Sequence, residues 1–71
     1  MTIKAYIHEN LSTLLFETKA LYIKVNATNF AKAVLNNIRE QEQEWNDSFN
    51  ADDKTIKDIA KRYYTVYVAR R

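Results

Sequence analysis

His8 is the only histidine in the chain, so any imidazole chemistry would have to start from this residue. Nucleophilic catalysis needs a serine, threonine or cysteine beside a base that a third group orients. The sequence has no cysteine, and its serines are Ser12 and Ser48. A zinc site needs three or four ligands, drawn mostly from Cys and His. We therefore predict no catalytic residues, no metal site, and an exposed or structural role for His8.

Carboxylates are the other groups that could form a general acid–base pair. Glu40 and Glu44 are four residues apart and share one face of a predicted helix, which Glu42 does not. A solvated helix face explains these residues, and a helix start explains Asp52 and Asp53. The chain has no glycine, which excludes the glycine-rich loops that bind nucleotide phosphates. We predict that the protein is not an enzyme and binds no cofactor.

Alternating apolar and polar residues indicate the first of the elements that must position these side chains. Apolar and polar residues alternate over 2–8 and 20–26, which is typical of half-buried strands. Residues 11–18 fit a strand or a helix, and we favour a strand that pairs with 2–8 through a turn at Asn10. Residues 64–69 are predicted to form a final strand.

Two helices are predicted between these strands. Apolar residues recur at helical spacing over 29–45, where Thr28 or Asn29 could cap the helix. A polar loop over 46–51 leads to a second helix over 52–62, with acids in its first turn and bases in its last. The fold class predicted is α+β: a small antiparallel sheet of three to four strands with two helices packed on one face, in the order β-β-β-α-α-β.

Length and composition limit the possible architectures and the cellular compartment. With 71 residues, of which 46% are hydrophobic, the chain is predicted to be a single compact domain over residues 1–71. So short a chain buries little surface, and a homodimer could bury more. Residues 1–8 lack the pattern of a signal peptide, and no apolar stretch approaches the ~20 residues of a membrane span. We expect a cytoplasmic protein that does not bind membranes.

The net charge of +2 is unevenly distributed, and it suggests two contact surfaces. An acidic segment carries aromatic residues, and tryptophan is over-represented among the residues that dominate protein–protein binding. Its carboxylates could attract a basic, nucleic-acid-binding surface of a partner protein. The alternative is that the aromatic rings fold back over the core. The residues of this predicted partner-binding surface are Glu40, Glu42, Glu44, Trp45, Asp47 and Phe49.

The second surface is basic and belongs to the C-terminal part of the chain. Residues 51–71 carry six basic and three acidic residues. Basic side chains could contact phosphates, and tyrosine rings could stack on bases. The residues of this alternative nucleic-acid surface are Lys57, Lys61, Arg62, Tyr64, Tyr67, Arg70 and Arg71.

Two resemblances bear on these alternatives. Residues 20–45, a short strand running into an amphipathic helix, resemble a ribbon–helix–helix antitoxin, which implies a dimeric DNA-binding regulator. In size and in its composition rich in Lys, Asn and Ile, the whole chain resembles small phage-encoded proteins that block host machinery, including anti-CRISPR proteins. That resemblance implies a non-catalytic protein-binding module that inhibits a host complex by occupying a surface. We take this as the main hypothesis, with the dimeric nucleic-acid-binding regulator as the alternative.

Overall fold

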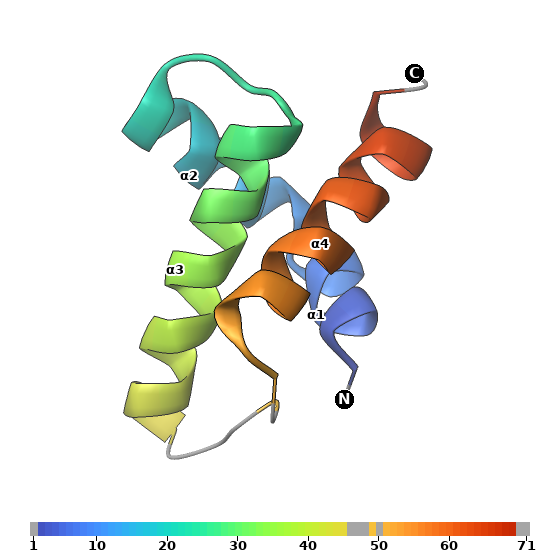
Figure 1. The fold of residues 1–71 in the computed structure, drawn as a ribbon. Helices are drawn as coiled ribbons and strands as arrows, with labels where there is room; N and C mark the ends of the chain where they lie inside the picture. Colours follow the sequence, from blue (N-terminus) through green and yellow to red (C-terminus); the bar gives the residue numbers. More distant parts are fainter. Residues whose placement is uncertain (1, 46–48, 50, 70–71) are drawn as a thin grey trace.

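The computed structural model describes residues 2–45, 49 and 51–69, and these residues form helices and loops without any strand (Figure 1). The predicted α+β fold with the order β-β-β-α-α-β is therefore wrong, because this part of the chain is all-helical. Its elements are α1 (Ile3–Glu9), α2 (Leu11–Tyr22), α3 (Ala27–Trp45), α4 (Asp53–Tyr63) and a π-helical turn, η1 (Tyr64–Val68).

The strand predicted over residues 2–8 is wrong: residues 3–8 lie in helix α1 and Thr2 is its cap, because the apolar spacing of this segment satisfies two periods at once. Ile3 and Ile7 fall on one face of a strand, but residues four apart are also neighbours on one face of a helix. Both side chains are buried. The Thr2 hydroxyl accepts a hydrogen bond from the backbone N–H of Ala5 at 3.1 Å, which caps the helix. The cap and the buried face together favour the helix.

Residues 11–18 lie in helix α2, so the strand favoured for them is wrong and the helical alternative is right. Leu14 and Thr18 are four residues apart and fully buried. The Thr18 hydroxyl donates to the Leu14 carbonyl at 2.7 Å, which satisfies a polar group inside the core. Asn10 does not turn a hairpin: its backbone N–H and its side-chain amide both donate to the Tyr6 carbonyl, at the end of α1.

The alternation over residues 20–26 belongs to the end of α2 and the connection to α3, so the predicted strand and the ribbon–helix–helix arrangement are wrong. Leu21 and Ile23 are 58% and 86% exposed. Ile23 has φ 66° and ψ −48°, and the N–H of Lys24 donates to the Tyr22 carbonyl at 2.6 Å. Ile23 is thus the central residue of a strained γ-turn. The turn reverses the chain so that α3 packs against α2.

Helix α3 confirms the helix predicted over 29–45, but it starts earlier than expected. Its cap is Asn26, not Thr28 or Asn29: the Asn26 Oδ1 accepts a hydrogen bond from the N–H of Asn29 at 2.8 Å. Asparagine is among the best capping residues because its short side chain reaches the free N–H groups of the first turn. The helix therefore begins at the first residue after this cap.

The core is arranged around α3, which packs against α2 on one side and α4 on the other (Figure 1). Phe30, Val34 and Ile38 form a fully buried stripe along α3. Ile56 and Ala60 of α4 are also fully buried and belong to the same hydrophobic cluster. Helix α4 corresponds to the second predicted helix, and its apolar face packs as the spacing indicated.

Residues 64–69 continue α4 through the π-helical turn η1, so the predicted final strand is wrong. The N–H of Ala69 donates to the Tyr64 carbonyl at 2.8 Å, a bond between residues five apart. The rings of Tyr63 and Tyr67 have their centroids 4.7 Å apart. Residues four apart meet on one face of a helix, and this tilted contact between the two rings stabilises the helical continuation.

A polar network joins three helices inside the molecule. The Tyr6 hydroxyl of α1 donates to Oδ1 of Asn37 in α3, and the Asn37 Nδ2 donates to both carboxylate oxygens of Glu17 in α2 at 3.2 Å. Asn37 is 8% exposed. Burial, and then the negative charge of Glu17, raise the pKa of the Tyr6 hydroxyl, which keeps it protonated as a donor.

Replacing Asn37 with Ala removes the shared partner of Tyr6 and Glu17. We expect the free energy of unfolding to fall by about 1–3 kcal/mol, because both groups lose a hydrogen bond in a partly buried site. Asn36, which is exposed on the same helix, is the matched control, and Asn36→Ala should change stability by less than about 0.5 kcal/mol. Urea denaturation followed by circular dichroism measures both. Equal effects of the two substitutions would contradict the network's role.

Replacing Ile23 with Gly should raise stability by roughly 1 kcal/mol, because glycine adopts a positive φ without steric cost. Ala20→Gly is the matched control, since Ala20 is exposed within α2. That change should lower stability by about 0.5–1 kcal/mol, because glycine is unfavourable inside a helix. Thermal unfolding compares the two proteins. A loss of stability in both would show that Ile23 is not strained.

Candidate functional site

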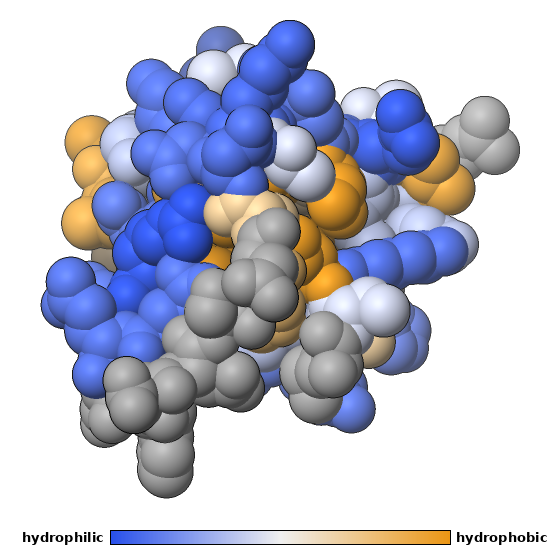
Figure 2. Space-filling view, turned by 60° about the horizontal axis from the view of Figure 1, so that its bottom comes forward, coloured by the Kyte–Doolittle hydropathy of each residue, from blue (hydrophilic) through white to orange (hydrophobic). Residues whose placement is uncertain are grey.

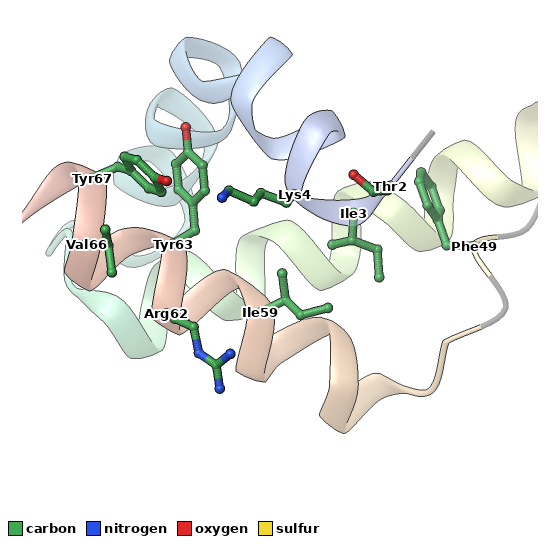
Figure 3. Close-up of a pocket in the computed structure, with 9 residues that line it drawn as sticks. All are labelled: Thr2, Ile3, Lys4, Phe49, Ile59, Arg62, Tyr63, Val66 and Tyr67. Carbon is green, nitrogen blue, oxygen red and sulfur yellow. The ribbon is translucent and has the colours of Figure 1, made fainter.

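An open groove of about 620 Å³ lies between α1 and the continuous helix made by α4 and η1 (Figure 3). Figure 2 turns the lower face of the molecule forward and shows apolar surface near its centre, flanked by hydrophilic side chains. The residues that line the groove come from both helices and from the segment before α4: Thr2, Ile3, Lys4, Phe49, Ile59, Arg62, Tyr63, Val66 and Tyr67.

One wall of the groove is a helix face that continues from α4 into η1. Ile59, Tyr63 and Val66 are spaced by four and then three residues, the spacing of one apolar helical stripe. Val66 and Tyr67 remain 42% and 47% exposed. Figure 3 shows Ile3 of α1 and Ile59 of α4 facing each other across the groove. This apolar stripe is therefore only partly covered by α1.

Tyr63 fixes the position of α1 beside this wall. Its side chain is 4% exposed, and a hydrogen bond of 2.9 Å joins its hydroxyl to Nδ1 of His8. The His8 and Tyr63 rings meet edge to face, with centroids 6.4 Å apart. The sole histidine thus has a structural contact between α1 and α4, as one of the two roles predicted for it.

Two cations belong to the groove, one on each side. The Lys4 ammonium of α1 lies 5.3 Å from the centroid of the Tyr67 ring, a cation–π distance. Arg62 of α4 is exposed and points away from α1 (Figure 3). Among the residues that the structure describes, neither cation forms a salt bridge, and no carboxylate lines the groove. The groove therefore combines an apolar floor with positive charge on its edges.

The start of α4 is positioned by Arg39 of α3. Its Nη1 pairs with Oε1 of Glu42 at 2.6 Å, and its Nη2 pairs with Oδ1 of Asp53 at 2.8 Å. The same Nη2 donates to the Ala51 carbonyl at 2.9 Å. Hydrogen bonds to Asp53 and then Glu42 raise the pKa of Arg39 above its ordinary value. This planar group ties α3 to the chain entering α4, in a geometry that lysine could not reproduce.

The predicted acidic surface is only partly described by the structure. Glu40 is exposed, whereas Glu42 forms bonds within the molecule. Its Oε1 pairs with Arg39, and its Oε2 accepts a hydrogen bond from the backbone N–H of Phe49 at 2.9 Å. The Phe49 ring packs edge to face on Tyr6, with centroids 5.5 Å apart, and it lines one end of the groove. The side chains of Glu44 and Trp45 and the whole of Asp47 lie outside the described part.

The predicted basic surface is divided by the fold. Lys61 and Arg62 are exposed and Lys57 is half-buried, but the tyrosines have other partners. Tyr64 donates its hydroxyl to the Val25 carbonyl at 3.2 Å and packs on Phe30. Tyr67 packs on Tyr63, and its ring lies beneath the Lys4 ammonium. Arg70 and Arg71 lie outside the described residues.

The groove combines members of both predicted surfaces with residues that sequence reasoning did not select. Phe49 comes from the acidic surface, and Arg62 and Tyr67 come from the basic one. Ile59 and Val66 have helical spacing, and this spacing could have indicated the wall of the groove. It was missed because the segment that contains Val66 was interpreted as a strand. The contribution of α1 to the groove could not be predicted without knowing that α1 packs against α4.

In the part of the chain that the structure describes, the fold is all-helical and carries a partly apolar groove. Within the described part, no cluster of three or more potential metal ligands is present. No helix there combines the length and apolar character needed to span a bilayer. No protein-family model matches the chain, and neither a curated protein nor a solved structure is significantly similar to it.

Asp52 caps α4, and its contribution to stability should depend on pH. The N–H of Thr55 donates to its Oδ1 at 2.8 Å. Hydrogen bonding with the side chain of Thr55, and then with its backbone N–H, lowers the pKa of Asp52 from its ordinary value. A folded-state pKa below the unfolded value means that the ionised carboxylate stabilises the fold above about pH 4, and that this stabilisation is lost as the pH falls through the folded-state pKa.

We therefore expect Asp52→Ala to lower the urea midpoint at pH 7, with a difference from the wild type that shrinks below about pH 4. Asp58→Ala, at an exposed position within α4, is the control and should have a smaller effect at pH 7. A difference between the wild type and Asp52→Ala that stays constant down to pH 2 would contradict this role of the carboxylate.

Proposed function

We propose that the protein is a non-catalytic binding module that holds a helical segment of a partner protein in the groove between α1 and α4–η1. The observation that carries this proposal is the apolar stripe of Ile59, Tyr63 and Val66, which extends past the end of α4, where Val66 and the neighbouring Tyr67 remain 42% and 47% exposed. Exposed apolar surface of this kind, bordered by polar residues, is typical of protein interaction sites.

A helical occupant fits the groove better than an extended one. Strand addition needs an exposed sheet edge, and the described part of the chain contains no strand. Ile59 and Tyr67 are eight residues apart, so this wall is about 12 Å long at 1.5 Å per residue. That length accommodates roughly two turns of a partner helix, whose anchors would also recur every three or four residues. Phe16 and Leu21, exposed on α2, do not line this groove.

A module of this kind would act stoichiometrically, by occupying a surface. The inhibition of a host complex, which the resemblance to small phage-encoded proteins implies, is one form of that activity. The nucleic-acid alternative gains no support from the described residues. Tyr64 and Tyr67, the rings expected to stack on bases, pack on Phe30 and Tyr63.

The test uses neutral amphipathic peptides of about 15 residues, long enough to form a helix. Their anchors, three residues on one face, vary among Leu, Phe and Met, and the remaining positions are Ala and Gln. Titration of the ¹⁵N-labelled protein should shift the amide signals of Ile3, Ile59 and Val66 for at least one peptide. If no peptide in the panel shifts these signals, the proposal is overturned.

Val66→Asp should weaken binding of that peptide by about ten-fold or more, because it places a charge in the apolar wall. Val66 is 42% exposed, so the fold should tolerate the change. Thr65→Asp adds the same charge at the exposed neighbouring position, which does not line the groove, and should leave affinity within about two-fold. Equal loss in both variants would place the binding surface elsewhere.

A further inference from the structure

We propose that the groove selects an acidic amphipathic helix, one whose apolar anchors are flanked on both sides by Asp or Glu. This inference rests on the proposed function and adds the chemistry of the partner. Its basis is the juxtaposition of Lys4 and Arg62 on opposite edges of an apolar floor that no described carboxylate lines.

The Lys4 ammonium is held in place at the η1 end of the groove. It lies over the ring of Tyr67, at 5.3 Å from the centroid, and this ring stacks on the buried Tyr63. Tyr63 is itself bonded to His8 of α1. A charge fixed by such contacts loses less conformational entropy when it binds a carboxylate than a freely moving lysine does. Figure 3 shows the Lys4 side chain directed toward these two rings.

Arg62 provides positive charge on the other edge. It follows Ile59 by three residues and precedes Val66 by four, so it borders the apolar stripe on the α4 side. Asp58 is one turn before it on α4, yet no salt bridge joins the two in the described part of the chain. The guanidinium therefore keeps its donors for a partner, and two of them can bind one carboxylate in parallel.

The two cations determine which helix fits. A helix lying between them would turn its apolar anchors toward Ile3, Ile59 and Val66, and the residues beside those anchors would face Lys4 on one side and Arg62 on the other. Carboxylates at these flanking positions form favourable pairs, whereas Lys or Arg would be repelled. A second copy of this chain docking through the same groove would place like charges together.

The experiment compares three versions of the peptide that binds in the previous test, with Glu, Gln or Lys at the flanking positions. Glu and Gln have similar helix propensities, so circular dichroism should show similar helicity for the first two. Against the full chain at low salt, the Glu peptide should bind about five-fold tighter than the Gln peptide, and the Lys peptide should bind weakest. Raising the salt concentration should reduce these differences.

The double variant Lys4→Gln/Arg62→Gln should bind the Glu and Gln peptides with equal affinity. Lys19→Gln/Lys24→Gln removes the same total charge from exposed lysines that do not line the groove, and it should preserve the preference for Glu. Equal affinity of the wild type for the Glu and Gln peptides would overturn this inference alone. Failure of every peptide in the earlier titration would instead overturn the proposed function.

Discussion

The buried stripe of Phe30, Val34 and Ile38 along α3 is the interaction on which the rest of the structure depends. Helices α2 and α4 pack on the two sides of α3. The chain has no cysteine for a disulfide, and the burial of these apolar side chains is a main contribution to its stability. The Arg39 contacts and the network of Asn37 then fix the directions in which the other helices leave α3.

The groove results from the same helix packing. Helix α1 is short, and it covers only part of the apolar face that α4 and η1 present. Tyr63 serves both the core and the groove: its hydroxyl bonds to His8, and its ring supports Tyr67 and, through it, the Lys4 ammonium. Because Tyr63 contributes both to stability and to the groove, the proposed binding is best tested at the partly exposed positions around it.

The candidate site was predictable in its composition but not in its assembly. The sequence indicated an aromatic residue at Phe49 and a basic, tyrosine-rich C-terminal part, and both contribute to the groove. From the sequence, Phe49 and the C-terminal part were predicted to belong to two separate surfaces, because the two segments were assigned to different elements. Lys4 and Ile3 could not be associated with either surface, since they lie more than fifty residues from Ile59 and meet it only through tertiary packing.

By itself the sequence determined the two amphipathic helices, α3 and α4, because their apolar residues recur over many turns and fit no other period. It also determined the absence of glycine-dependent phosphate loops. Tertiary structure decided the state of the shorter segments 2–8 and 64–69. In windows this short, residues spaced by two and four satisfy strand and helix alike, and the choice depends on the available partner: the described fold offers these segments the apolar faces of other helices and no strand to pair with.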